Sequence, residues 1–236
     1  MPARKVATRE PLTRDRVLAA ARDLADEDGL DALTMRRLAE ALGVEAMSLY
    51  HHVPNKDAIL DGLVELAFAE FEDEGAQDGT PTTTPATWQH DLRARILAAR
   101  RVLLRHRWVP QLVENRAMAS PAMIRYTDDV VGLMRAGGLS YDLIHHSLHA
   151  LGSRMYGFTQ ELMPNESNSN VDMDPRMMAM VPNLAAMLAG VVHDEPGDTL
   201  GWCDDQTEFE FRLDILLDGI ERRRVATVSG PAAVDL

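Results

Sequence analysis

Apolar residues recur every three or four positions along most of the chain, which is the spacing of one face of an α-helix. The first such stretch covers residues 14–28, with Thr13 before it as a candidate N-cap and Gly29 after it as a stop signal. The strict alternation of apolar and polar residues that marks a half-buried strand is absent. The pattern therefore predicts an all-α fold of about nine helices.

Residues 34–56 contain two short helical patterns joined by a turn. Thr34 is the candidate N-cap of the first helix, and Gly43 permits the turn because glycine tolerates a left-handed backbone. The second helix starts at Glu45 and is broken by Pro54, whose ring cannot continue it. The inward faces are expected to consist of Leu38, Ala41, Leu42 and Leu49. This arrangement predicts a helix-turn-helix.

A longer helix is expected after Asn55, a further candidate cap. Its apolar stripe is wider than a three-helix head requires, so it is expected to connect that head to a second body. The polar segment 72–84, rich in Gly, Pro and Thr, marks a linker. We predict a helix-turn-helix head over residues 12–58, a connector helix over 55–73 and a larger helical body over 74–225. Further helical patterns cover residues 85–106, 121–136, 140–162, 177–192 and 205–224.

Charge and cysteine content narrow the function classes. The formal net charge is −13, but residues 1–60 carry nine basic and ten acidic residues, so nearly all of the negative charge lies in the body. That body would repel phosphate, and any contact with DNA is expected at the head. A single cysteine, Cys203, excludes an internal disulfide and is typical of a reducing cytoplasm. We expect no secretory signal and no membrane span, because no apolar run reaches ~18 residues.

Fourteen residues of the head carry a resemblance to a known family: Thr34, Arg36, Leu38, Ala39, Leu42, Gly43, Val44, Leu49, Tyr50, His52, Val53, Asn55, Lys56 and Leu60. Together with the upstream Gly29-Leu30 pair, they resemble the DNA-binding head of the tetracycline-repressor (TetR) family over residues 12–72. The body is more loosely similar to that of the tetracycline repressor itself. That similarity is carried by residues 136–140, 150–152, 156–158 and 209–219.

The resemblance implies a cytoplasmic homodimer that represses transcription and leaves its operator DNA when a small effector binds. It also implies that the helices at 140–162 and 205–224 pair with their copies as a four-helix bundle. Both helices carry more apolar surface than one body needs, which favours a dimer interface. The alternative is that these apolar faces belong to the core of a single body. An effector that favours a tilted connector helix would move the two heads off the ~34 Å spacing of successive major grooves.

A helix in the major groove needs short or polar side chains toward the bases and hydrogen-bond donors toward the phosphates. The residues expected to contact DNA are Thr34, Arg36, Ala46, Met47, Ser48, Tyr50, His51, His52 and Lys56. By resemblance Arg36 reaches a guanine, and Ser48 is the other strong partner for base edges. Phosphate contacts are expected from Thr34, Tyr50, His52 and Lys56.

Several of these positions have other interpretations. Tyr50 could be half-buried packing, and His52 could be a structural histidine. Met47 replaces the small residue usual in the family, and His51 replaces a larger aromatic or basic residue. These departures bear on the operator sequence and not on the mode of binding. Arg37 is expected to be a solvated surface charge.

Ligand pockets are mostly apolar with a few polar groups, and the body is rich in methionine, which adapts to irregular shapes. The residues expected to bind the effector are Trp108, Met118, Tyr126, Met134, His149, Met155, Met177, Met180 and Met187. The alternative is that they are ordinary core residues. The tetracycline repressor coordinates a ligand-bound magnesium through a histidine beyond a His-Arg pair. Here Val113 stands at that position after His106-Arg107, so we expect no metal and no cofactor.

His145 and His149 lie one helical turn apart, a spacing that metal ligands also use. A place at the dimer interface, a surface position, a polar contact in the pocket and a metal ligand all stay open for this histidine cluster. No nucleophile–base pair and no phosphate loop accompany it, so we expect no enzyme. A DNA-binding regulator without a small ligand is the remaining alternative.

Overall fold

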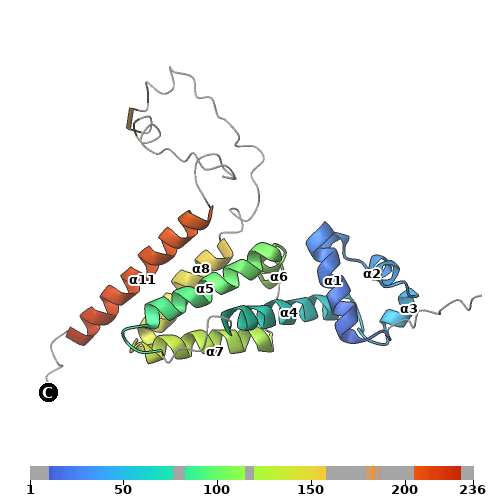
Figure 1. Cartoon of the computed structure of the whole chain (residues 1–236), viewed down its shortest axis with the longest axis horizontal. Helices are drawn as coiled ribbons and strands as arrows, with labels where there is room; N and C mark the ends of the chain where they lie inside the picture. The colour runs from blue at the N-terminus through green and yellow to red at the C-terminus, as the bar shows by residue number, and fades with distance from the viewer. Residues whose placement is uncertain are drawn as a thin grey trace, which may run out of the picture. The chain divides into compact units, whose positions relative to one another are not determined.

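The computed structural model describes residues 11–76, 83–114, 120–157 and 205–229, with a few single residues between 180 and 186. These parts of the chain form nine α-helices and one short 3-10 helix, without a strand (Figure 1). The all-α prediction is confirmed. The chain divides into two compact units: Met1–Pro81 with Ala94–Val131, and Thr82–Arg93 with Gly132–Leu236. None of the described helices is long and apolar enough to span a membrane.

Short-range hydrogen bonds decide where the first helices begin. Helices α1 (Arg14–Asp28) and α2 (Met35–Leu42) follow Thr13 and Thr34, whose hydroxyls each accept from the backbone amide three residues on, at 3.2 Å. The side chain of Asn55 does the same for the connector helix, at 2.8 Å. These contacts satisfy amides that have no partner inside the helix. All three predicted N-caps are confirmed.

The second half of the head departs from the predicted boundaries. Helix α3 is only one turn long, Ala46–Leu49, and ends in a turn in which the Leu49 carbonyl accepts from the amides of both His52 and Val53 at 2.9 Å. The connector helix α4 (Lys56–Ala76) runs past its predicted end at residue 73. A single 3-10 turn, η1 (Leu30–Ala32), links α1 to α2.

The core of the head lies where α1, α2 and α4 meet. Leu38 and Ala39 are buried on α2, whereas Ala41, which was predicted to face inward, is exposed. That prediction was wrong because α2 packs on both α1 and α3, which turns its buried face toward Ala39. Gly62 of α4 lies so near α1 that a Cβ there would sit 2.5 Å from Cδ2 of Leu18. This close approach accounts for a glycine inside a helix, where it otherwise costs ~1 kcal/mol relative to alanine.

The first unit continues with parts of two long helices and one short helix. Helix α5 (Trp88–Arg105) starts after a turn at residues 85–87, later than predicted, and helix α7 (Pro121–Ala136) has its predicted bounds. Helix α6 (Val109–Glu114) was not predicted. Pro110 lies in its first turn, where a proline without an amide hydrogen is tolerated, and the turn is stabilised by burial.

An aromatic cluster packs α4 against α7 inside the first unit. The rings meet edge to face, with centroids 4.8 to 5.8 Å apart. Its members are Phe68, Phe71 and Tyr126. Such pairs contribute ~0.5–1.5 kcal/mol beyond the area they bury. The connector helix is therefore held firmly along its second half.

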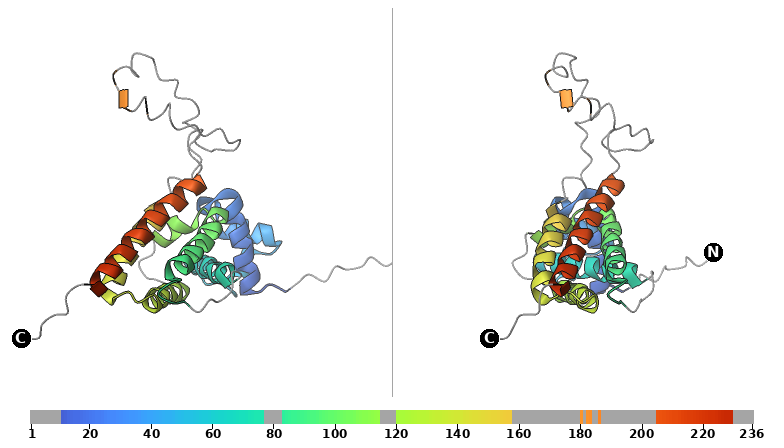
Figure 2. Two further views of the ribbon diagram at one scale, coloured as in Figure 1. Left: turned by 60° about the vertical axis from the view of Figure 1, so that its left-hand side comes forward. Right: turned by 90° about the vertical axis from the view of Figure 1, so that its left-hand side faces the viewer.

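The second unit is built around α8 (Tyr141–Gly157) and α11 (Asp205–Ser229), which lie side by side (Figure 2). The buried residues of α11 recur at helical spacing and are Phe209, Leu213, Leu217 and Ile220. Helix α11 extends beyond its predicted end at residue 224. The predicted end of α8 and most of the predicted helix at 177–192 lie outside the described residues.

Polar contacts tie the start of α5 to α11 in this unit. The indole of Trp88 donates to Glu221 at 3.1 Å, and its ring packs so closely on Gly137 that a Cβ there would be 2.5 Å away. Arg93 donates to Asp214 and Glu210, each at 2.7 Å. These contacts join segments more than a hundred residues apart in sequence.

Candidate DNA-binding surface and ligand site

The turn between α2 and α3 has the geometry expected of a helix-turn-helix. Gly43 adopts φ 65° and ψ 37°, in the left-handed region, and closes α2. Its amide donates to the Glu40 carbonyl at 3.1 Å, and the Val44 amide donates to Ala39 at 3.0 Å. Leu49 is fully buried and anchors α3. The remaining side chains of α3 are thereby available to a partner outside the head.

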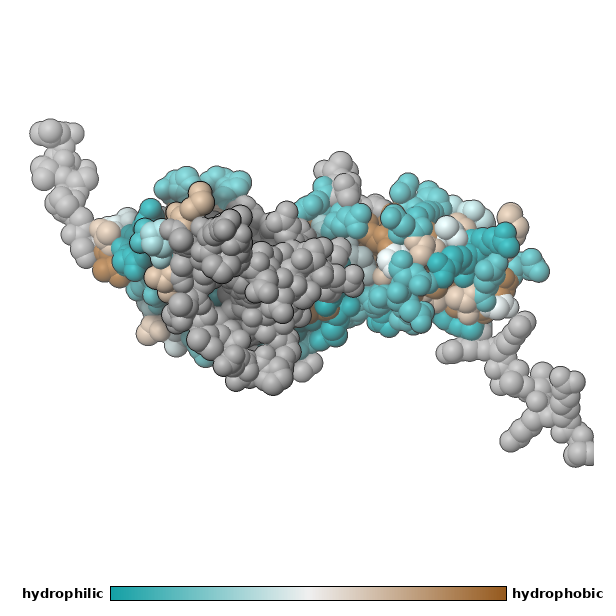
Figure 3. Space-filling view, turned by 90° about the horizontal axis from the view of Figure 1, so that it is seen from above, coloured by the Kyte–Doolittle hydropathy of each residue, from teal (hydrophilic) through white to brown (hydrophobic). Residues whose placement is uncertain are grey.

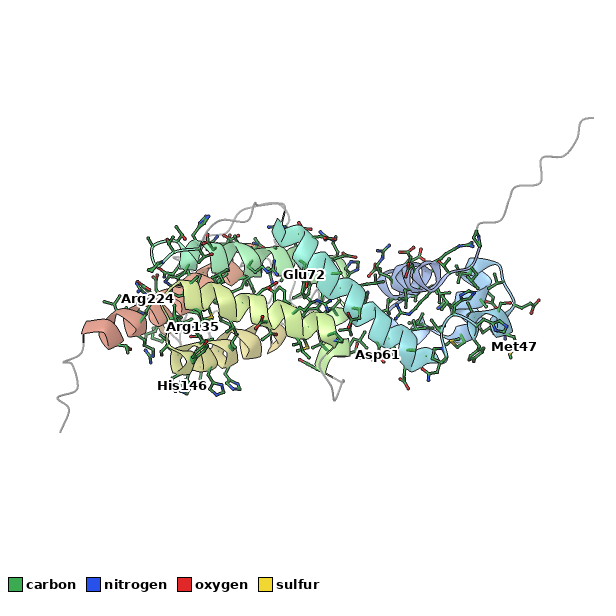
Figure 4. The ribbon with its side chains drawn as sticks, turned by 90° about the horizontal axis from the view of Figure 1, so that it is seen from below. Met47, Asp61, Glu72, Arg135, His146 and Arg224 are labelled. Carbon is green, nitrogen blue, oxygen red and sulfur yellow. The ribbon has the colours of Figure 1, made fainter. Side chains whose placement is uncertain are left out.

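The predicted base-reading residues lie together on and just after α3. Met47 and Tyr50 are 72% and 45% exposed, and His51 is exposed as well, while Ala46 and Ser48 are half-buried. The side chain of Met47 projects from the outer end of the head (Figure 4). The surface of the head is mostly hydrophilic, with small separate hydrophobic spots, on the face seen in Figure 3. Tyr50 is thus not closed off by packing, and its hydroxyl can reach a phosphate.

Arg36 and Arg37 differ sharply although they are neighbours. The side chain of Arg36 is 89% exposed and donates to Glu40 on the next turn of α2, at 2.9 Å. Exposed pairs of this kind are worth at most ~1 kcal/mol, so the guanidinium can leave Glu40 for a base. Arg37 instead donates to Asp28 at the end of α1. Arg37 is an exposed surface charge, as predicted, and its contact with Asp28 also joins α2 to α1.

Thr34 and Lys56 stand at the starts of α2 and α4, where backbone amides favour an anion. The Thr34 hydroxyl accepts from the helix and keeps its own hydrogen for a phosphate oxygen. Lys56 is exposed, and His52 is half-buried with its backbone amide bonded to Leu49. All nine predicted DNA residues thus lie within the helix-turn-helix or at the first residue of α4, and their contact with DNA stays a prediction.

Two of the predicted effector residues are buried in the first unit with defined partners. Trp108 is 6% exposed, and its indole donates to Asp26 of α1 at 2.6 Å. Tyr126 is 5% exposed, belongs to the aromatic cluster and lies under Arg95, whose Cζ is 4.9 Å from the ring centroid. Both side chains hold helices together in this structure, which favours the alternative of ordinary core residues for them.

The other predicted effector residues are dispersed. Met134 is fully buried in the second unit, His149 is exposed on α8, and Met180 is 81% exposed. Met118, Met177, Met187 and the side chain of Met155 lie outside the described residues. The described residues therefore do not assemble the predicted ligand pocket, and that site stays a prediction.

A groove of about 270 Å³ runs between α8 and α11 in the second unit. It is lined by Leu143, His146, Ser147, Ile215, Ile220 and Arg223, among others. Ile215 is 52% exposed at this groove and Phe211, one turn away, is 61% exposed. These residues were not predicted one by one, but the family resemblance implies that both helices pair with their copies, and their apolar spacing marks the groove as a surface that another protein could cover.

The histidine cluster of His145, His146 and His149 is exposed on α8, and His146 also lines the groove beside α11. The rings of His145 and His149 are 4.7 Å apart, and Nε2 of His146 lies 3.8 Å from Asp142. His146 projects away from its helix (Figure 4). Among the described residues, no group of three or more His, Cys, Asp or Glu side chains is placed to hold a metal ion.

Two carboxylates in the body have perturbed ionisation. Two hydrogen bonds from Arg224, at 2.5 and 2.6 Å, lower the pKa of Glu221 against the opposing effect of partial burial, and the Trp88 indole adds to the lowering. Hydrogen bonds from Arg101 and Arg105, at 2.8 and 2.9 Å, lower the pKa of Glu74 on α4. Both groups are ionised structural partners.

Comparison with known families agrees with the geometry of the head and extends to the body. Residues 17–63 match the profile "Bacterial regulatory proteins, tetR family". Residues 80–224 match the profile "Tetracyclin repressor-like, C-terminal domain", which alone covers more than half of the chain. The two profiles together span nearly all of the described helices.

Individual relatives are similar along most of the chain. Tetracycline repressor protein class A of Escherichia coli is 30% identical over 224 residues, covering 93% of this chain and 96% of that protein. An HTH-type transcriptional regulator of Saccharopolyspora erythraea is 34% identical over 137 residues, 58% of this chain, and the match spans only about half of its length (55%). Among solved structures, apo ActR of Streptomyces coelicolor has a TM-score of 0.70 at 25% identity, covering 92% of this chain and 99% of ActR. ActR has also been solved in complex with actinorhodin, with a TM-score of 0.63 at 25% identity over 91% of this chain and 99% of ActR.

Proposed function

Since the chain belongs to the tetR family of bacterial regulatory proteins, we propose that it is a homodimeric transcriptional repressor of the cytoplasm. In this proposal the repressor leaves a palindromic operator when a small, largely apolar effector binds its body. Residues 12–58 bind the operator DNA, and residues 74–225 form the dimer and bind the effector. Helix α4 connects these two parts of the chain. The single observation that carries the proposal is the exposure of Met47, Tyr50 and His51 on a helix-turn-helix with buried anchors. No catalytic activity is part of it.

The proposed contacts with DNA follow from what each side chain can offer. Arg36 gives up its weak pair with Glu40 and donates two hydrogen bonds to a guanine, a contact worth ~1–3 kcal/mol of discrimination. Ser48 contacts a second base edge, and Met47 contributes apolar contact, for instance to a thymine methyl. Phosphates are held by Thr34, Tyr50, His52 and Lys56, with Ala46 and His51 on the same surface. With so few base-edge hydrogen bonds, specificity rests on two paired half-sites and on DNA shape.

The proposed dimer forms through α8 and α11. Phe211 and Ile215 are large exposed apolar side chains on α11, and the groove beside Ile215 has room for side chains of a second copy. Covering them removes apolar surface from water, worth ~25 cal/mol per Å². A dimer also places two heads for two half-sites, which a palindromic operator requires.

The effector is proposed to act by population shift. It binds the released conformation more tightly, so that α4 takes an orientation in which the two heads no longer match successive major grooves. An apolar effector is favoured because Val113 replaces the histidine that would hold a metal-bound ligand. The complex of the similar ActR with actinorhodin supports a site for a small organic molecule in this class of body. The predicted residues Trp108, Met118, Tyr126, Met134, His149, Met155, Met177, Met180 and Met187 remain the proposed set.

Selection of bound sequences from random duplex DNA by the full chain tests the proposal. The expected result is a palindrome whose half-sites have centres about one helical turn apart or a multiple of that. Footprinting on the DNA that flanks the protein's own gene, repeated with apolar candidate effectors, then tests release. A thermal-shift screen of the same compounds provides a second measurement, because a ligand of the folded body raises Tm. Selection of no sequence would refute operator binding, whereas a palindrome without any responsive compound would favour a regulator without a small effector.

A further inference from the structure

His106 is a buried histidine with a carboxylate on each side. Its side chain is 9% exposed, just after α5. Nδ1 lies 2.8 Å from Oδ1 of Asp26 on α1, and Nε2 lies 2.9 Å from Oε2 of Glu70 on α4. One ring thus bridges the helix that opens the head and the helix that leaves it. All three residues belong to the first unit.

The protonation state of the ring follows from the number of N–H donors that the two contacts need. A neutral imidazole has one N–H donor and one acceptor, whereas an ionised carboxylate only accepts. Both contacts of His106 are hydrogen bonds only when each ring nitrogen carries a proton. The geometry therefore calls for an imidazolium between Asp26 and Glu70. With a neutral ring, a nitrogen lone pair would face a carboxylate in a buried place, which is unfavourable.

The groups around His106 are consistent with a cation there. Oδ1 of Asp26 also accepts from the Trp108 indole at 2.6 Å. Glu70 lies 3.5 Å from Arg22 and 3.6 Å from Arg105. The charged groups of the bridge and of the ion pairs that connect to it on α1, α4 and α5 are Asp23, Asp26, Arg22, Glu70, Glu74, Arg101 and Arg105. Four of these described side chains are carboxylates and three are guanidinium groups, so an imidazolium balances the set.

The bridge lies where α1, the first helix of the head, meets α4 and the segment between α5 and α6. Asp26 is in the last turn of α1, and two residues on Asp28 accepts from Arg37 of the helix-turn-helix. Glu70 is in the second half of α4, beside the aromatic cluster. His106 and Trp108 belong to the corner between α5 and α6. The last turn of α1 thus contacts α2 through Asp28, and it contacts that corner through Asp26, whose partner His106 also meets Glu70 of α4.

We propose that His106 is a positioning residue whose imidazolium holds α1 on α4 and on the α5–α6 corner, and thereby sets the orientation of the DNA-binding head. This proposal rests on the proposed operator binding. We call the set of Asp26, Glu70, His106 and Trp108 the clasp. Asp26, Glu70 and His106 are not among the residues proposed to contact DNA or effector. It acts by keeping the two heads of a dimer at the separation that a palindrome needs.

If His106 positions the head, its loss should affect the affinity for a palindrome and the affinity for a single half-site differently. A single half-site engages one head and is indifferent to the separation of the heads. A palindrome needs both heads in register, and the second contact gains from a high effective concentration only when the geometry is right. Loss of the clasp should lower affinity for the palindrome and leave affinity for the half-site unchanged.

The experiment compares two duplexes by fluorescence anisotropy with the full-length protein. One carries the selected palindrome, and the other carries one half-site with the second scrambled. His106→Gln and Asp26→Asn are expected to lower the ratio of palindrome to half-site affinity about tenfold, an order set by the coupling of buried charged groups. Glu27→Gln on the same helix and His90→Gln on α5, both at exposed residues, are the matched controls and should keep the wild-type ratio.

Hydrogen exchange of the free protein gives a readout that needs no DNA. In His106→Gln the amides of the last turn of α1 should exchange faster, while those at the end of α7 stay as in the wild type. Trp108→Phe removes one donor without a change of charge and should show the same pattern more weakly. If His106→Gln does not fold, hydrogen exchange of Trp108→Phe is measured in its place.

The outcomes are distinguishable. Equal loss on both duplexes would mean that the substitutions damage the head itself, which overturns the positioning role. An unchanged ratio in both variants would overturn it as well. If the wild-type protein binds no palindrome, the proposed function fails. The hydrogen-exchange rates of the α1 amides then show by themselves whether the clasp holds α1 in place.

Discussion

The reading surface of the head and the α8–α11 face both expose apolar side chains, but they do so differently. On the head, Met47 is exposed beside Tyr50, whose ring carries a polar hydroxyl, and the neighbouring Ala46, Ser48 and His51 are small or polar. On α11, Phe211 and Ile215 are exposed one turn apart, beside a groove, and Val225 follows further along. Isolated exposed apolar residues are normal on protein surfaces, whereas contiguous ones mark a surface that another molecule covers. The difference separates a surface suited to reversible contact with DNA from one suited to lasting contact with a second copy.

The polar groups of the two regions follow the same division. Arg36 is bound only to Glu40 of its own helix, with most of its surface in water. In the second unit, Arg93 and Glu221 are part-buried and join α5 to α11. Weak local pairs leave a side chain free to change partners, and part-buried pairs between helices do not. DNA recognition and assembly therefore draw on different kinds of residue in this chain.

The largest expected effect comes from a charge on the α11 face. Ile215→Asp should abolish the dimer, because a carboxylate would be buried without a partner in the interface. Size-exclusion chromatography with light scattering measures this against the chain mass of 26.2 kDa. Binding to the palindrome should be lost with the dimer.

The matched control is Ile124→Asp on α7, at an isoleucine of similar exposure, 58% against 52%. It should leave the dimer intact. A dimeric Ile215→Asp variant would show that the exposed face of α11 is not the interface.

The next effect concerns the reading surface. Arg36→Ala and Tyr50→Ala should each weaken operator binding at least tenfold while the dimer stays intact, since base and phosphate contacts are worth ~1–3 kcal/mol each. A gel-shift titration measures the affinity. Wild-type-like binding by both variants would refute the assignment of this surface.

Glu40→Ala sharpens the same test. It removes the partner of Arg36 without touching the proposed DNA contacts, so operator affinity should be equal to or higher than that of the wild type. A loss as large as that of Arg36→Ala would mean that the ion pair itself, and not a base contact, is what matters.

A smaller effect is expected inside the head. Gly62→Ala places a Cβ 2.5 Å from the Leu18 side chain and should lower the free energy of unfolding by ~1–3 kcal/mol through overpacking. Gly132→Ala, in α7, meets nothing within 4 Å and should raise it by ~0.5–1 kcal/mol through helix propensity. Urea denaturation followed by circular dichroism measures both. Equal effects of the two substitutions would contradict the close approach of α1 and α4.

The smallest effect depends on pH. Because hydrogen bonds from Arg224 lower the pKa of Glu221 in the folded protein, its carboxylate contributes stability above the ordinary pKa of 4.5, and this is lost as the pH falls through the lowered value. Glu221→Gln should therefore be less stable than the wild type at pH ~7 by no more than ~1 kcal/mol, and the gap should close toward pH ~3. Asp218→Asn, an exposed control on α11, should show no such trend. A gap that widens in acid would reverse the sign of the assigned shift.

Much of the head could be predicted because its local structure depends on neighbours within four residues. Thr13, Thr34 and Asn55 each cap a helix through an amide three positions on, and Gly43 takes the left-handed conformation that a short turn requires. Such contacts are contained in a short stretch of sequence. For the same reason the helix-turn-helix and the all-α class follow from the order of residue types.

The remaining assignments depended on contacts between segments far apart in the chain. Asp26 contacts His106 and Trp108, which lie eighty or more positions later in the chain. No pattern in the nearby sequence predicts these contacts. Trp108 and Tyr126 carry suitable side chains for a pocket, but packing gave them partners in the core. The sequence by itself determined most of the helical segments, the starts of the capped helices α1, α2 and α4, and the helix-turn-helix, since those follow from short-range hydrogen bonds and apolar spacing. Only the tertiary structure decided which charged groups meet between helices, because that depends on how whole helices pack.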